Sequence, residues 1–261
     1  MIDGKNKINV VVDHENKLHV LYDENNCRLQ IPESIAIILD GNGRYAKKHN
    51  IPRPLGHKAG CETLEIILEE AVKIGVKFLT VYAFSTENWK RSTDEINALF
   101  DLFFIYFDKV YKKAIDNNIK INFIGNIYEF PQKIYNECEK LMKDTENLNR
   151  MTFTIAFNYG GRDEILRTFK KIYKNNIDIE KISVNDISNN LDTYNIKDPD
   201  LLIRTSGEYR ISNFLLWQLA YTELYFTNVL WPEFTIEEFY KSIVEFNKRE
   251  RRFGGRAENN K

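Results

Sequence analysis

Short apolar runs alternate with longer helical patterns along the chain from Ser34 onward. Six runs have the length and composition of buried strands: Ile35–Leu39, Phe78–Phe84, Lys120–Ile124, Met151–Phe157, Leu201–Arg204 and Leu224–Phe226. Helical spacing covers residues 58–74, 93–116, 131–147, 162–175, 184–191 and 235–251. Apolar strands separated by helices predict a single α/β domain, with a mostly parallel central sheet of about six strands flanked by helices.

The first 31 residues have a different character. They are polar, with apolar alternation at Ile8–Val12 and Leu18–Tyr22, which fits either a short hairpin or a loose arm. Residues 32–255 contain no repeat, linker or Pro/Gly-rich boundary, so we predict one catalytic domain there and a short tail at 256–261.

Composition excludes several classes of protein. The 37 basic and 38 acidic residues give a net charge of -1, which argues against nucleic acid as a partner. Cys27, Cys61 and Cys138 lie far apart without a C-x-x-C pair, as expected of reduced thiols in a cytoplasmic protein. No signal peptide or membrane span is visible in the sequence, so any membrane association would be peripheral, through a lipid product.

Polar residues collect where the predicted strands end. Ligands of open α/β sheets bind outside the carboxyl ends of the strands. Four of these ends carry arginine beside glycine, serine or asparagine: Asp40–Arg44, Ser85–Arg91, Asn158–Arg162 and Arg204–Arg210. One such turn is ordinary turn chemistry. Four on one edge of a sheet predict a binding site.

The residue types at this edge suit a diphosphate. Gly41 and Gly43 let backbone N–H groups approach a phosphate, beside a helix predicted to begin near Arg44. Bidentate or hydroxyl donors are available from Arg44, Arg53, Arg91, Arg204, Arg210, Ser85 and Ser212. Asp40 would repel a bare phosphate, so its presence there indicates Mg²⁺ between the two.

Taken singly, these residues have simpler interpretations. Asp40 alone can be a helix cap, His57 an N-terminal or surface residue, and Trp89 a packing residue. Each arginine by itself is more often part of a surface ion pair. These single interpretations do not explain why the residues occur together.

Longer motifs resemble the cis-prenyltransferases of the undecaprenyl diphosphate synthase type. They run over Ile35–Ala46 with Gly56–Gly60, over Tyr82–Trp89, over Arg204–Trp217 with Tyr221, Glu223 and Leu230–Pro232, and over Arg252–Gly255. The resemblance implies a transferase that condenses isopentenyl diphosphate onto an allylic diphosphate, such as farnesyl diphosphate, to give a long-chain product such as undecaprenyl diphosphate. It also implies Mg²⁺ and a homodimer.

The resemblance also implies roles for individual residues. Asp40 is similar to the essential aspartate that handles Mg²⁺ and the leaving diphosphate, and Glu223 to a second metal carboxylate. Asn88 matches a proton-handling position. The remaining matches are substrate-binding: Gly41, Asn42, Gly43, Arg44, Tyr45, Arg53, His57, Ser85, Thr86, Glu87, Trp89, Arg91, Arg204, Arg210, Ile211 and Ser212.

Two positions depart from the bacterial pattern of this family. Tyr45 replaces the usual tryptophan, and Tyr209 stands where many members have a histidine near the metal.

The apolar segment Ser212–Tyr225 predicts the dimer interface, although a core segment has the same pattern. The apolar helix 93–116 predicts a wall for a growing hydrocarbon, although such a helix is usually just buried.

Two alternatives stay open beside this interpretation. One is a non-catalytic prenyltransferase partner subunit, against which Asp40, the glycines and Glu223 argue. The other is a nucleotide-binding α/β enzyme, which would be expected to show a P-loop or G-x-G-x-x-G after its first strand. Product length, preferred primer and downstream glycan pathway are not encoded in a recognisable pattern.

Overall fold

The computed structural model describes residues 8–13, 15 and 18–251. Its centre is a six-stranded, all-parallel sheet with strand order β5-β6-β4-β3-β7-β8. The strands are β3 (Ser34–Ile38), β4 (Phe78–Ser85), β5 (Ile119–Ile124), β6 (Met151–Tyr159), β7 (Leu201–Arg204) and β8 (Glu223–Phe226). All six predicted strands are therefore confirmed, as is the α/β class. The central strands are apolar throughout because both faces of the sheet are covered.

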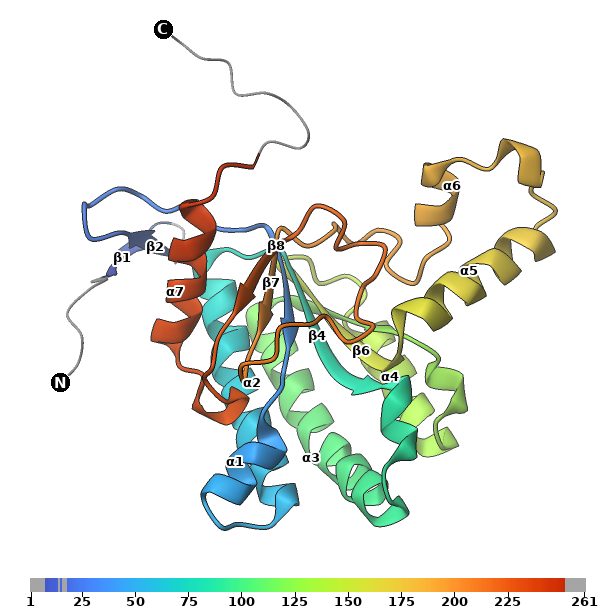
Figure 1. Ribbon diagram of the computed structural model, residues 1–261, viewed down its shortest axis with the longest axis horizontal. Helices are drawn as coiled ribbons and strands as arrows, with labels where there is room; N and C mark the ends of the chain where they lie inside the picture. The colour runs from blue at the N-terminus through green and yellow to red at the C-terminus, as the bar shows by residue number, and fades with distance from the viewer. Residues whose placement is uncertain (1–7, 14, 16–17, 252–261) are drawn as a thin grey trace, which may run out of the picture.

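The helices cover the two faces unequally (Figure 1). One face packs against α2 (Arg53–Ile74), α3 (Thr93–Asn117), α4 (Gln132–Asp144) and α7 (Ile236–Asn247), and most of the buried apolar side chains lie there. A smaller core on the other face includes Phe214 and Leu215 from the loop before β8. The helices α5 (Gly161–Lys174) and α6 (Val184–Ser188) follow β6, and α5 contributes buried Glu164 and Thr168.

The segment after β3 differs from the sequence expectation in one respect. A short helix, α1 (Asn42–Lys48), begins as predicted near Arg44, but the next helix starts at Arg53 rather than at residue 58. Pro52 and Pro54 are compatible with a helix start, where a missing N–H costs nothing. Gly56 and Gly60 then let α1 pack closely on α2, because a Cβ at Gly60 would lie 2.2 Å from the Asn42 Oδ1 atom.

The N-terminal strands β1 (Asn9–Asp13) and β2 (Leu18–Tyr22) form an antiparallel pair. The pair lies on the same side of the molecule as α7 (Figure 1). His19 Nδ1 lies 2.7 Å from Glu70 Oε1, which joins the strand pair to α2. Of the helices in the described part of the chain, none has the length and apolar character needed to cross a membrane.

The described residues also form four 3-10 segments. They are η1 (Thr86–Lys90), η2 (Ile127–Glu129), η3 (Ile179–Lys181) and η4 (Trp231–Glu233). Two of them matter for the site: η1 follows β4 at the carboxyl edge of the sheet, and η4 packs against α1 and α2.

Candidate active site

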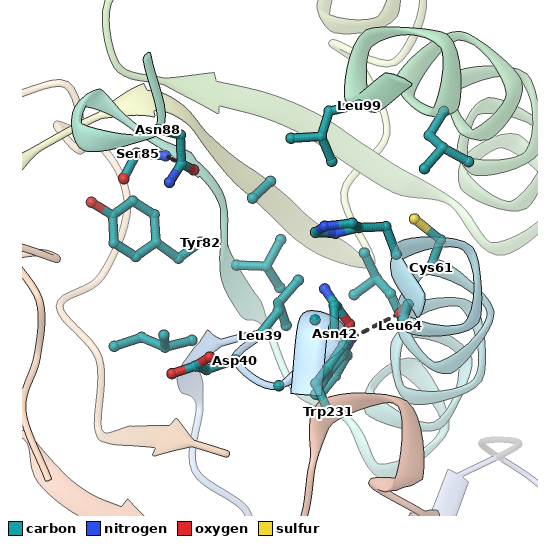
Figure 2. Close-up of a pocket in the computed structure, with 18 of the residues that line it drawn as sticks. Leu39, Asp40, Asn42, Cys61, Leu64, Tyr82, Ser85, Asn88, Leu99 and Trp231 are labelled. Atoms are coloured by element: carbon teal, nitrogen blue, oxygen red, sulfur yellow. Dashed lines mark hydrogen bonds between the residues drawn. The ribbon is translucent and has the colours of Figure 1, made fainter. Parts of the chain in front are cut away.

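A cavity of about 1140 Å³ opens at the carboxyl edge of the sheet and continues between the sheet, α2 and α3. Its outer part is lined by charged and polar residues, and its inner part by apolar ones. Asp40 follows β3, Ser85 ends the neighbouring strand β4 and Asn88 follows it; all three face the same space (Figure 2). The predicted meeting therefore occurs for the ends of β3 and β4 and for Arg210 after β7, at the entrance of a deep apolar cavity, whereas Asn158–Arg162 at the end of β6 do not line it.

Asp40 is held by two arginines. Its Oδ2 atom accepts a 3.0 Å hydrogen bond from Arg204 Nη2, and its Oδ1 atom lies 3.2 Å from Arg44 Nη2. Burial alone would raise the pKa of Asp40, but the Arg204 hydrogen bond and the charges of Arg44 and Arg204 hold this pKa below its ordinary value. The carboxylate is therefore ionised at neutral pH and fixed in direction.

The backbone around Asp40 is fixed by Gly41. Gly41 has φ of 120°, a conformation that residues with a Cβ rarely adopt. A Cβ at this position would also lie 3.0 Å from the Leu230 Cα and Trp231 N atoms, and Trp231 N donates to the Asp40 carbonyl. A side chain at residue 41 would therefore displace the segment that carries Asp40.

The arginines at the entrance are paired with carboxylates. Arg53 Nη1 lies 3.2 Å from Glu95 Oε2, and Arg91 Nη1 donates to Glu95 Oε1 over 2.9 Å. Arg44 and Arg210 both form ion pairs with Glu208. These pairs hold the guanidinium groups around the cavity in the absence of an anion, so a phosphate would meet donors that are already grouped.

Arg204 supports the same region from behind. Its side chain is 4% exposed, and its Nη1 atom donates to Ser212 Oγ over 2.7 Å and to the Arg210 carbonyl. One buried guanidinium thus links Asp40 to the loop that carries Arg210 and Ser212. Its position makes it a support for Asp40 and that loop, whereas Arg210 and Ser212 themselves line the cavity.

His57 lines the cavity as a neutral imidazole. Burial, reinforced by the charges of Arg91 and Arg53, lowers the pKa of His57 to about 4. Its Nε2 atom is buried and has no hydrogen-bond partner among the described residues. Asn42 Oδ1 is in the same condition. Both residues line the cavity, so these two atoms offer it hydrogen-bonding capacity that the described residues do not use.

The η1 turn places Ser85 and Asn88. The Asn88 Oδ1 atom accepts a hydrogen bond from the Ser85 backbone N–H over 3.0 Å, which closes a capping box at this turn. Trp89 is pinned on the outside, where its Nε1 donates to Asn158 Oδ1 over 2.8 Å. Asn158 is fully buried and also donates to Glu129 and to the Asn126 carbonyl. The turn is thereby fixed to β6 and η2.

The inner part of the cavity is apolar. The helix α3 contributes Leu99, Leu102, Phe103, Tyr106, Phe107 and Val110, and α2 contributes Cys61, Leu64 and Leu68. The predicted wall from helix 93–116 is therefore present. Burial, with a smaller effect of the Glu65 charge, raises the pKa of Cys61 to about 12, so this residue lines the wall as a neutral thiol.

Several predicted substrate-binding residues do not line the cavity. Tyr45 packs on His49 with ring centroids 4.3 Å apart, and Trp89 packs on Phe84 and Phe130. Ile211 belongs to the core on the opposite face of the sheet. Thr86 lies beside Gly160 at the start of η1. By contrast, Gly41, Asn42, Gly43, Arg44, Arg53, His57, Ser85, Glu87, Asn88, Arg91, Arg210 and Ser212 all line it.

Glu223 is not brought to Asp40 within one chain. It begins β8, level with Leu201 and Ile35, whereas Asp40 follows the other end of β3. Along the strand direction, Glu223 is therefore roughly 10 Å from the carboxyl end of β3. Across the sheet it is two strands away, which adds about 10 Å in the perpendicular direction. Its carboxylate pairs with Arg249 at 2.9 Å. The predicted strand Leu224–Phe226 already contained this signal, because Glu223 precedes that strand whereas Asp40 follows its own.

Tyr209 lies outside the site, and the segment Ser212–Tyr225 differs in part from expectation. Tyr209 is 74% exposed, next to Phe226, and does not line the cavity. Phe214 and Leu215 are buried in the chain's own core, so the core alternative holds for that part of the segment, while Tyr221 and Leu224 remain exposed. The motif Arg252–Gly255 lies outside the described residues.

Some residues of the site were not identified from sequence. Glu95 pairs with Arg53 and Arg91, Glu208 pairs with Arg44 and Arg210, and Asn213 donates to Glu87 over 3.0 Å. Their common signal was proximity in sequence to predicted site residues. Trp231 lines the cavity and donates to the Gly60 carbonyl over 2.7 Å (Figure 2).

A cationic entrance that leads into a long apolar cavity defines a binding site for an amphiphile with an anionic head, the kind of substrate that a prenyltransferase handles. The comparisons with known proteins agree. The family described as putative undecaprenyl diphosphate synthase matches residues 38–254, and the chain belongs to this family of isoprenyl transferases. It is therefore a transferase enzyme.

Relatives and solved structures match over most of the chain. An isoprenyl transferase of Fusobacterium nucleatum is 51% identical to this chain, over 86% of this chain and 96% of the relative. An isoprenyl transferase of Clostridium tetani is 48% identical, over 86% of this chain and 90% of the relative. The structure of a lavandulyl diphosphate synthase of Lavandula x intermedia, in complex with dimethylallyl diphosphate, matches with a TM-score of 0.82 and 31% identity. The match covers 85% of this chain and 98% of that protein. The structure of a probable undecaprenyl diphosphate synthase of Campylobacter jejuni matches with a TM-score of 0.74 and 31% identity, over 87% of this chain and 100% of that protein.

Proposed function

We propose that the chain condenses isopentenyl diphosphate onto an allylic diphosphate and elongates it to a long cis-polyprenyl diphosphate. The observation that carries this proposal is the continuity of one cavity from Asp40 and the arginines to the apolar side chains of α3. In each cycle the allylic C–O bond breaks and diphosphate leaves. A C–C bond forms to the terminal alkene carbon of isopentenyl diphosphate. A proton is then lost from the methylene bonded to the internal alkene carbon, and a new double bond forms between these two carbons.

The allylic diphosphate is assigned to the side of the cavity formed by α1 and the start of α2. Gly43, Arg44 and Arg53 lie there with His57, and the Arg53 Nε atom is 3.3 Å from the position of a Cβ on Gly43. The small residue leaves that guanidinium accessible. Because His57 is neutral, it can donate one hydrogen bond without adding a charge that the free site would have to neutralise.

Isopentenyl diphosphate is assigned to the opposite side, where Arg210 and Ser212 supply donors and Arg204 holds their loop. Asn88 and Ser85 face both subsites. We assign proton handling to Asn88: its Oδ1 atom is engaged by the Ser85 N–H, and its Nδ2 group can donate to and so orient the diphosphate oxygen or water that accepts the proton. Arg91 completes the ring of cations.

Magnesium fits the donor set at Asp40. Mg²⁺ binds one or two carboxylates together with substrate phosphate oxygens and waters, and Asp40 supplies an ionised carboxylate at the entrance. Among the described residues no group of three or more His, Cys, Asp or Glu side chains is placed to hold a metal, so the substrate would supply most ligands. When bound, Mg²⁺ would neutralise charge on the leaving diphosphate. Glu223 can join this site only from a second copy of the chain.

The inner cavity supports a long product. At about 0.8 kcal/mol per buried CH₂ group, each added five-carbon unit gains up to ~4 kcal/mol from burial. We propose farnesyl diphosphate as primer and a product such as undecaprenyl diphosphate, with shorter or longer products as the alternative. A homodimer through the exposed Tyr221 and Leu224, and a cytoplasmic location with three free cysteines, belong to the same proposal.

One assay tests the function. The protein is incubated with farnesyl diphosphate, labelled isopentenyl diphosphate and Mg²⁺, and the extracted lipids are separated by chromatography. We expect labelled polyprenyl products that require Mg²⁺. An absence of labelled lipid from folded protein, with several allylic primers, would favour the non-catalytic partner-subunit alternative.

A further inference from the structure

A line of charged residues closes the seam between α2 and α3, on the outside of the inner cavity. Lys109 and Lys113 of α3 both approach Glu65 of α2, with Nζ–Oε distances of 3.5 and 3.7 Å, and Lys113 also pairs with Glu69. One turn earlier, the Tyr106 hydroxyl donates to the Lys58 carbonyl over 3.3 Å. We call Glu65, Glu69, Lys109 and Lys113 the seam ladder.

Glu65 is unusual because it also lines the apolar part of the cavity. Its side chain is 19% exposed, and its Oε1 atom is buried and accepts no hydrogen bond from the described residues. The nearest cation to that oxygen is Lys109. The carboxylate therefore contributes to the cavity wall beside Leu64 and Leu68 and is stabilised mainly by the two lysines of the neighbouring helix.

The position of Glu65 is near the inner end of the cavity. It lies twelve residues after Arg53 on α2, roughly 18 Å along the helix axis from the entrance. Beyond it the lining continues for only about one more turn, to Leu68 on α2 and Val110 on α3. A hydrocarbon that starts at Asp40 and fills the apolar lining would reach Glu65 late in its growth.

We propose that the seam ladder, through Glu65, limits the length of the product. This inference rests on the proposed function. An apolar chain gains free energy while it covers Leu64, Phe103 and Phe107, but at Glu65 it would have to exclude the remaining water from a carboxylate that has few hydrogen-bond partners. Further extension is then disfavoured, and the ladder also keeps α2 and α3 from separating to make more room.

The test compares the products of wild type with those of Glu65→Leu and Glu65→Gln at a large excess of isopentenyl diphosphate. Glu62→Leu is the matched control, because Glu62 lies one turn earlier on α2, is exposed, and does not line the cavity. We expect Glu65→Leu to move the main product up by at least one five-carbon unit, Glu65→Gln to move it less, and the control to leave it unchanged.

The isosteric Glu65→Gln variant keeps the inference testable if Glu65→Leu does not fold, as judged by circular dichroism. Product lengths of folded Glu65 variants equal to those of wild type and control would overturn the inference, and so would a shift toward shorter products. If wild type forms no labelled lipid, the proposed function has failed instead. If wild type is active and only the lengths are insensitive to Glu65, the proposed function stands and the ladder has no part in product length.

Discussion

The entrance and the inner part of the cavity are built by different physical means. At the entrance, charged side chains hold one another in place: Arg204 and Arg44 fix Asp40, and Glu95 fixes Arg53 and Arg91. In the inner part, aromatic rings such as Phe103 and Phe157 fix the wall by packing, with centroids 4.4 Å apart. Substitutions at the entrance should therefore lower turnover with little change in the free energy of unfolding. Substitutions in the inner part should lower the free energy of unfolding with little change in the rate of the chemical step.

The largest effect on turnover is expected at Asp40. Asp40→Ala should leave the fold intact and lower turnover by about 10³-fold or more, because the carboxylate that positions the metal against the leaving diphosphate is lost. Turnover and thermal unfolding are measured on the same preparation. The control is Glu33→Ala, at an exposed carboxylate before β3. Near wild-type turnover of folded Asp40→Ala would place the chemistry elsewhere.

Arg204→Met should have the next largest effect, about a 10²-fold loss of turnover, because Asp40 and the Arg210–Ser212 loop lose their common support. Without the hydrogen bond from Arg204, the pKa of Asp40 should also rise. As the pH is lowered, the variant should therefore lose activity at a higher pH than the wild type does. A pH profile of kcat/KM for wild type and variant checks this. An unchanged profile would show that Arg204 does not control Asp40.

Phe157→Ala should show the opposite behaviour. Phe157 is fully buried and contacts the rings of Phe84, Phe103, Phe107, Phe123 and Phe130. Its truncation should lower the free energy of unfolding by about 3–5 kcal/mol. Single-turnover addition of the first unit should change less than about tenfold. Denaturant unfolding gives the free energy of unfolding, and rapid-quench kinetics give the rate of the first addition. If Phe157→Ala lowered that rate more than Asp40→Ala does, the contrast between entrance and interior would be wrong.

Tyr209→Phe should change turnover less than about tenfold, because residue 209 is exposed and outside the cavity. Glu223→Gln should raise the Mg²⁺ requirement only if a second copy brings Glu223 to Asp40. Initial rates are measured against Mg²⁺ concentration for both variants, together with sedimentation. A greater defect in Tyr209→Phe than in Glu223→Gln would contradict this assignment.

The smallest effect concerns His57. Its folded pKa of about 4 is below the unfolded value of about 6.5, so the unfolded chain binds more protons between these values. Stability should therefore fall as the pH drops from about 6.5 to about 4, and His57→Asn should lose that part of the dependence. NMR titration should find a neutral imidazole at pH 6. A protonated His57 at that pH in the free enzyme would contradict the buried, cationic surroundings.

The same contrast explains what the sequence could predict. The strands were readable because β3 and β6 are buried on both faces, and part of the entrance was readable because Asp40–Arg44 and Asn88–Arg91 directly follow β3 and β4. Glu95 could not be assigned to the site from the sequence, because its pairing with Arg53 depends on how α2 and α3 pack. Glu223 was assigned to the metal from the resemblance alone, although the predicted strand Leu224–Phe226 places it at the amino end of β8 and not at the edge where Asp40 lies.

The central claim is that the charged entrance and the apolar interior bind the two parts of one substrate. A crystal structure of the protein with Mg²⁺ and an unreactive thio analogue of farnesyl diphosphate tests it most directly. We predict that the diphosphate contacts Arg44, Arg53 and the Gly43 backbone, with the hydrocarbon between α2 and α3 toward Leu64. A diphosphate bound away from Asp40, or a hydrocarbon that points out of the cavity into solvent, would contradict the claim.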